Sequence, residues 1–197
     1  MRTLSPSAQK VCTIAVEQFA EHGYDAASLN DIAVAAGMRK PSLYAHFSSK
    51  DDLFEAVFER ALEAERLYVE DCFAQCDDAL PGARYSHCLG ERYQQSAHLR
   101  FLLRTAFFPP AALRPIISAG FEEYLTRLGE AFEQALASCL PHLPMARREL
   151  YVDAYLGVVD SLSVELIYAG PEAYARRLRA MWAVFGDALN PAGALPR

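Results

Sequence analysis

Apolar residues recur at helical spacing along almost the whole of this 197-residue chain, and this periodicity limits the fold more than any other feature. Near the start of the chain, Val11, Ile14, Ala15 and Phe19 share one helical face. Proline and glycine then separate one helical segment from the next. Alternating strand patterns and Asn-Gly or Asp-Gly hairpin turns are missing from the sequence. We therefore predict an all-α protein.

Two short helices are expected on either side of Gly37. Ser28 can cap the first helix, and Asp31 follows three residues later, as in a capping box. Gly37 suits a turn position with positive φ. The second helix is expected from Lys40 to Phe47. This pattern predicts a helix-turn-helix, a motif whose second helix enters the major groove of DNA.

The charge distribution agrees with such a motif. The chain has a net charge of −6, yet its three lysines all lie in the first 50 residues. Between Gly37 and Lys50 the charged residues are Arg39, Lys40 and Lys50, with no acid among them. A small basic patch on an acidic chain is typical of a protein that touches DNA through one short element.

Other classes of protein receive less support. The sequence contains no phosphate loop, His-Glu-x-x-His or Gly-x-Ser-x-Gly motif, so we expect neither an enzyme nor a cofactor. No apolar stretch is long enough for a signal peptide or a membrane span, which predicts a cytoplasmic protein. Cys72, Cys76 and Cys88, with His87, leave open a redox or soft-metal sensor, although no metal site is predicted. A helical adaptor that binds protein remains another alternative.

Three segments, residues 19–24, 28–33 and 36–53, resemble the DNA-binding signature of the TetR family. The resemblance covers about residues 8–58 and includes the glycine turn, the Tyr-x-His-Phe ending and the lysine that follows. It departs from the common pattern at Met38-Arg39, where many relatives have Val-Ser, so the capping serine is replaced by a guanidinium.

The resemblance implies roles for individual residues. Ser28, Tyr44, His46 and Lys50 would contact the DNA backbone. Arg39, Lys40, Ser42 and Ala45 would face the bases. It also implies a helix-turn-helix domain over residues 1–50 and a ligand-binding and dimerisation domain over 51–190. The proline- and glycine-rich composition of residues 191–197 predicts a flexible tail.

The larger domain offers candidates for two further sites. Residues near its dense aromatic segments are candidates for an effector pocket: His98, Phe101, Arg104, Phe107, Phe121, Tyr124 and Tyr155. Residues on its last two expected helices are candidates for a homodimer interface: Ala154, Gly157, Val158, Ser161, Leu178, Met181, Trp182 and Phe185. The resemblance implies a repressor that a small molecule of unknown identity releases from a palindromic operator. We expect the helix from about residue 51 to residue 75 to transmit this change, because it joins both domains.

Overall fold

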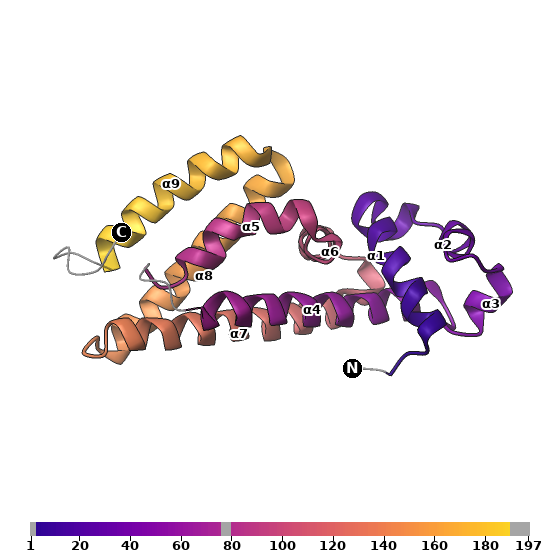
Figure 1. Ribbon diagram of the computed structural model, residues 1–197, viewed down its shortest axis with the longest axis horizontal. Helices are drawn as coiled ribbons and strands as arrows, with labels where there is room; N and C mark the ends of the chain where they lie inside the picture. Colours follow the sequence, from indigo (N-terminus) through magenta and orange to yellow (C-terminus); the bar gives the residue numbers. More distant parts are fainter. Residues whose placement is uncertain (1–2, 76–79, 190–197) are drawn as a thin grey trace. The chain divides into compact units, whose positions relative to one another are not determined.

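The computed structural model describes residues 3–75 and 80–189, and within these ranges every regular element is a helix (Figure 1). The elements are α1 (Pro6–Ala26), α2 (Leu29–Ala35), α3 (Lys40–Tyr44), α4 (Lys50–Ala74), α5 (Ala83–Gln95), α6 (Ala97–Phe107), the 3₁₀ turn η1 (Ala111–Leu113), α7 (Arg114–Cys139), α8 (Met145–Tyr168) and α9 (Gly170–Leu189). The predicted all-α class is confirmed. Cys76 and the expected tail 191–197 lie outside the described residues.

The chain divides into two compact units. The first unit is Met1–Glu65 with Ser96–Glu122, and the second unit is Arg66–Gln95 with Glu123–Arg197. Helices α4 and α7 therefore contribute residues to both units. The boundary predicted at residue 50 concerns function, and it stays a prediction.

An aromatic cluster forms the centre of the first unit. The rings of Phe19 and Phe54 meet edge to face, with centroids 5.0 Å apart, and those of Phe54 and Phe101 meet in the same way at 5.0 Å. All three side chains are almost completely buried. Burial of one such side chain contributes about 1.5–3 kcal/mol. This cluster joins α1, α4 and α6. Buried residues of α2 and α3 belong to the same hydrophobic core.

The second unit has its own aromatic core. Tyr155 of α8 is fully buried and stacks on Phe132 of α7, with ring centroids 4.2 Å apart and planes 7° apart. The Tyr155 hydroxyl donates a hydrogen bond to the carbonyl of Gly82, just before α5. Phe185 of α9 also packs on Phe132, at 6.0 Å. These contacts tie α7, α8 and α9 to the start of α5.

Two helix boundaries show how local chemistry shapes the fold. Gly23 interrupts α1 with φ +77° and ψ 176°, and a short further turn follows it to Ala26. Ser96 divides residues 83–107 into α5 and α6, with no glycine or proline beside it. Ser96 Oγ accepts the N–H of Leu99 at 3.1 Å and so caps α6.

No helix in the described part of the chain combines the length and the apolarity that crossing a membrane requires.

Candidate nucleic-acid interface

The helix-turn-helix forms as predicted. Ser28 Oγ accepts the N–H of Asp31 at 3.4 Å and caps α2. Gly37 follows the end of α2 with φ +74°, the left-handed region that favours glycine. The Met38 N–H then donates to the Ala33 carbonyl at 2.9 Å, which closes the turn before α3.

The buried side of the motif holds α3 in place. Ile32 of α2 and Leu43 of α3 are fully buried, as is Phe47 just beyond α3. The Phe47 N–H donates to the Leu43 carbonyl at 3.0 Å, so the backbone continues its turn after the regular helix ends. The regular helix is shorter than the expected Lys40–Phe47, because residues 45 and 46 adopt a turn.

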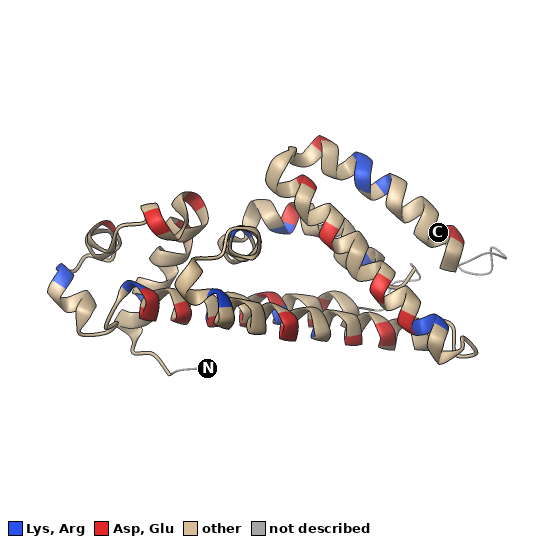
Figure 2. Cartoon of the chain, turned by 180° about the vertical axis from the view of Figure 1, so that it is seen from behind, with Lys and Arg blue, Asp and Glu red and all other residues tan. Residues whose placement is uncertain are grey.

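The opposite side of α3 faces solvent. The predicted base-facing residues Arg39, Lys40, Ser42 and Ala45 are all exposed, and Tyr44 is 45% exposed. Figure 2 shows basic residues at the start of α3 and acidic residues on neighbouring helices. The exposed face of α3 contains no acidic residue and begins with Arg39 and Lys40. Such a face favours binding of an anionic polymer.

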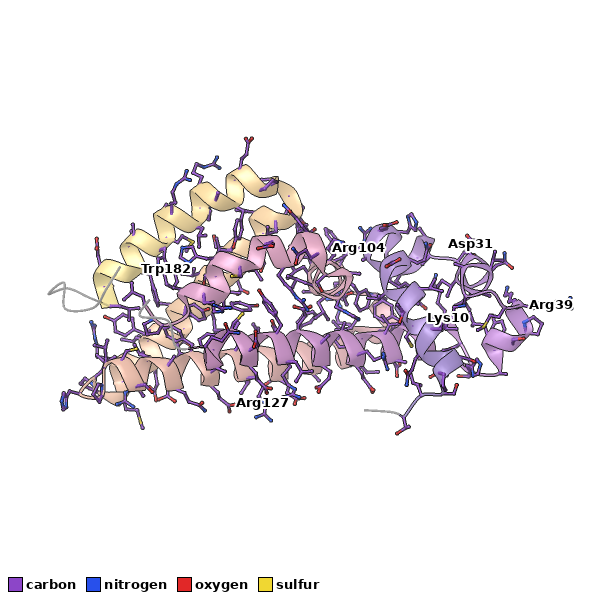
Figure 3. The ribbon with its side chains drawn as sticks, in the orientation of Figure 1. Lys10, Asp31, Arg39, Arg104, Arg127 and Trp182 are labelled. Carbon is purple, nitrogen blue, oxygen red and sulfur yellow. The ribbon has the colours of Figure 1, made fainter. Side chains whose placement is uncertain are left out.

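Arg39 stands at the N-cap position of α3, where it makes no side-chain capping hydrogen bond. It lies at the outer edge of the first unit and projects away from α1 and α2 (Figure 3). The departure from the family pattern thus leaves α3 without a side-chain cap and places a guanidinium at the end of the helix that would reach the bases. Lys40 lies 6.0 Å from the ring centroid of Tyr44, one turn later.

Lys50, a predicted backbone contact, belongs to a cluster that sequence reasoning did not assign. Its ammonium donates to the Asp25 carbonyl at 3.2 Å and lies 4.6 Å from the ring centroid of Tyr24. The Tyr24 hydroxyl donates to Asp51, and burial together with this carboxylate raises the pKa of Tyr24 to about 12. Tyr24 lies inside the quoted family segment, but spacing alone does not show what its ring touches.

Lys10 is a second residue near the motif that the site prediction omitted. Its Nζ lies 3.7 Å from the position that a Cβ on Gly37 would occupy. The ammonium on α1 is therefore beside the turn between α2 and α3 (Figure 3). Ser28 and His46, the two other predicted backbone contacts, are half-buried.

The structure separates the candidate effector-pocket residues. His98, Phe101, Arg104, Phe107 and Phe121 fall in the first unit, whereas Tyr124 and Tyr155 fall in the second. Phe101 is part of the aromatic cluster, and Phe121 packs on Phe58 with centroids 5.6 Å apart. In the second unit the Tyr124 hydroxyl hydrogen-bonds to that of Tyr85 at 3.0 Å.

The second unit contains a cavity of about 420 Å³ that none of these candidates lines. It lies among α4, the start of α5 and α7, and its described lining is mostly apolar: Glu70, Cys72, Phe73, Ala74, Gln75, Leu80, Pro81, Gly82, Arg84, Tyr85, Ala131, Gln134, Ala135, Ser138 and Cys139. Tyr155 does not line the cavity, but its hydroxyl donates a hydrogen bond to the carbonyl of Gly82, which does. Ala131 and Ala135 lie four residues apart on one face of α7, and their small side chains are the feature of the sequence that could have indicated the cavity.

The candidate interface residues divide by exposure. Val158, Leu178 and Phe185 are buried within the second unit, and Met181 and Trp182 are half-buried. Ala154 and Gly157 are exposed and Ser161 is half-buried. These three belong to a stripe along α8 with spacings of three and four residues, which we call the α8 stripe: Leu150, Ala154, Gly157, Ser161, Val164 and Tyr168. Val184 on α9 is 74% exposed.

The cysteines do not form a metal cluster among the residues described. No group of three or more His, Cys, Asp or Glu residues there is arranged to hold a metal ion. Cys72 is buried and Cys88 half-buried, while Cys76 lies outside the described residues. Burial raises the pKa of the Cys72 thiol, which disfavours the thiolate form that metals and oxidants require.

Residues 13–57 match the family model described as bacterial regulatory proteins, tetR family. Over 49 residues the chain is 45% identical to the HTH-type transcriptional repressor ComR of Escherichia coli (strain K12), and the match covers 25% of this chain and 23% of ComR. Over 49 residues it is 49% identical to the HTH-type transcriptional activator FasR of Mycolicibacterium smegmatis, covering 25% of this chain and 22% of FasR. The chain thus matches about a quarter of the length of these relatives.

The fold extends the similarity beyond that segment. A tetR-family transcriptional regulator from Streptomyces coelicolor superimposes with a TM-score of 0.70, over 98% of this chain and 87% of that one, at 20% sequence identity. At this identity the comparison concerns the fold alone.

Proposed function

We propose that this chain, whose residues 13–57 match the tetR family of bacterial regulatory proteins, is a TetR-family regulator that binds duplex DNA through its first unit. The observation that carries the proposal is the exposed, acid-free face of α3, held by the buried Leu43 and Phe47. Members of this family are DNA-binding transcription factors rather than enzymes. A regulator of this kind works where bacterial DNA is, so we place it in the cytoplasm.

The proposed contacts follow from the position of each residue. Arg39, Lys40, Ser42 and Ala45 face the base edges in the major groove. A further set contacts the sugar–phosphate backbone: Ser28, Tyr44, His46 and Lys50. A bidentate contact from an arginine to guanine contributes about 1–3 kcal/mol of discrimination against other bases.

We further propose a homodimer that reads a palindromic operator. The α8 stripe supports this proposal, since it is a mostly apolar face of a long helix that includes small residues. A Cβ added to Gly157 would meet no atom of another part of the chain within 4 Å, which leaves room for a partner helix. Packing α8 and α9 against their copies would form a four-helix interface with two-fold symmetry. The two recognition helices would then lie about 34 Å apart, one turn of DNA.

For regulation, we propose a small-molecule effector that releases a repressor from its operator. The cavity of about 420 Å³ in the second unit has the apolar lining and few polar groups, among them Gln134 and Ser138, that such sites use. The effector must bind more tightly to a conformation that fits DNA poorly, because equal affinity would shift no population. We propose repression because the chain is similar to the repressor ComR. The similarity to the activator FasR keeps activation as the alternative.

The decisive experiment selects bound sequences from a random duplex pool. Wild type should enrich a palindrome, and Lys40→Ala should lose that enrichment. Arg127→Ala is the matched control, because it removes one exposed positive charge from the second unit (Figure 3). Absence of enrichment by wild type at low salt would contradict DNA binding, and enrichment of a single, non-repeated half-site would contradict the dimer.

A further inference from the structure

The ring of Tyr24 is half-buried and packs on two phenylalanines of the first unit. It packs edge to face on Phe54, with centroids 5.4 Å apart and planes 81° apart, and stacks on Phe19 at 6.4 Å. Its hydroxyl donates to Asp51 at the start of α4. The aromatic cluster and the Asp51 carboxylate therefore both restrain the ring, and the Lys50 ammonium lies over it.

Lys50 occupies a position that helix electrostatics disfavour. It is the first residue of α4, where the helix dipole is positive and a cation is destabilising. Two contacts offset this, since the ammonium lies over the Tyr24 ring at 4.6 Å and donates to the Asp25 carbonyl at 3.2 Å. A cation over an aromatic face is attracted by the ring quadrupole, and both contacts restrict a side chain with four rotatable bonds.

We propose that Tyr24 is a positioning residue for DNA binding, and that it acts by holding the Lys50 ammonium where a backbone phosphate meets it. This rests on the proposed function, in which Lys50 contacts the DNA backbone. The ring face, more than the hydroxyl, supplies the effect, because the cation lies over the ring. Without the ring, Lys50 would sample many rotamers around an unfavourable helix terminus, and the phosphate contact would be made less often.

The salt dependence of DNA binding tests this directly. Each phosphate contact steepens the plot of log affinity against log salt by about 0.9, so two Lys50 residues in a dimer contribute about 1.8. Between 50 and 200 mM salt that difference amounts to roughly a 12-fold smaller loss of affinity in a variant that lacks both contacts. A protein that is merely less stable loses active fraction at every salt concentration and keeps its slope.

The variants are Lys50→Met, Tyr24→Met, Tyr24→Phe and the double variant Tyr24→Met/Lys50→Met, on the operator selected with wild type. Lys50→Met and Tyr24→Met should give equally shallow slopes, the double variant should be no shallower than either, and Tyr24→Phe should keep the wild-type slope. A wild-type slope for Tyr24→Met beside a shallow one for Lys50→Met would overturn the proposal. So would a shallow slope for Tyr24→Phe.

A measurement on the wild-type protein keeps the inference testable if Tyr24→Met does not fold. Ring current from Tyr24 should shift the Lys50 side-chain proton resonances upfield relative to those of Lys10, and unshifted resonances would overturn the proposal. Failure of the proposed function has a different signature, because wild type would then bind no duplex or Lys40→Ala would bind as wild type does.

Discussion

Replacement of Gly23 by alanine should destabilise the first unit through the backbone. Gly23 has φ +77° and ψ 176°, a region that is essentially restricted to glycine. Forcing an L-residue into such a conformation costs about 1–3 kcal/mol. A second effect points the same way, since a Cβ at this position would lie 2.9 Å from Nε of Arg104 on α6.

The two effects differ in size. Arg104 is exposed, and its guanidinium is the far end of a flexible side chain beside α1 (Figure 3). It can rotate away from a methyl group at little cost, whereas the backbone at Gly23 is fixed by Tyr24 on one side and by the hydrogen bond from the Ala27 N–H to the Gly23 carbonyl on the other. The backbone strain should therefore dominate the loss of stability.

Urea unfolding followed by circular dichroism measures this loss. For Gly23→Ala we expect a loss of about 2 kcal/mol, which lowers the melting temperature by about 4–8 °C in a chain of this size. Arg104→Ala alone should change stability little, and the double variant should remain as unstable as Gly23→Ala. Recovery of most of the stability in the double variant would refute the reasoning, because it would make the side-chain clash the main cause. An unchanged Gly23→Ala variant would refute it as well.

Three other predictions concern individual side chains. Leu43→Ala should cost about 2–5 kcal/mol and abolish sequence-specific binding in a gel-shift assay, because Leu43 is fully buried and anchors α3. Tyr155→Phe should lower the free energy of unfolding by about 1 kcal/mol, since it removes the hydrogen bond to Gly82 but keeps the stacked ring; a change below the error of the urea titration would contradict this. The pKa of Tyr24, raised to about 12 in the folded protein from 10.0, predicts a fall in stability as pH rises from 10 to 12, because the unfolded state loses this proton first. Tyr24→Phe should show a smaller fall over that pH range, and an equal fall would contradict the assignment.

Local signals predicted the helix-turn-helix well. The cap at Ser28, the positive φ at Gly37 and the burial of Leu43 depend on neighbours within a few residues, so the sequence contains the information directly. The break at Ser96 has no comparably specific local signal. A lone serine between two helical patterns caps α6, but serine is also common within helices, and no glycine or proline marks the boundary.

Contacts between residues far apart in the chain could not be predicted from the sequence. Phe101 and Tyr155 both look like apolar pocket residues, yet one joins the aromatic cluster of the first unit and the other braces the start of α5. Which core a helix joins depends on residues far away in the chain, and periodicity reports only which face is apolar. The Tyr24–Lys50 contact is similar, because it joins residues 26 positions apart through a ring face.

Gly157 offers the clearest test of the proposed dimer. Adding one methyl group there should stabilise a single protomer but weaken a dimer in which α8 packs closely on its copy. A glycine inside a helix is destabilising by roughly 0.5–1 kcal/mol relative to alanine. A Cβ on Gly157 would meet nothing within 4 Å in the single chain, so Gly157→Ala should stabilise an isolated protomer. If α8 instead approaches its copy closely at this position, the added methyl must push the helices apart and weaken association.

Sedimentation across a range of concentrations, beside urea unfolding of dilute protein, separates these effects. We expect Gly157→Ala to unfold at higher urea when dilute and to dissociate at higher protein concentration than wild type. Val34→Ala is the matched control, since Val34 is 68% exposed on α2 in the first unit and its replacement improves helix propensity away from the α8 stripe. It should raise stability and leave association unchanged. Unchanged association in both variants would show that the chains do not meet at Gly157, and the dimer would then need another surface.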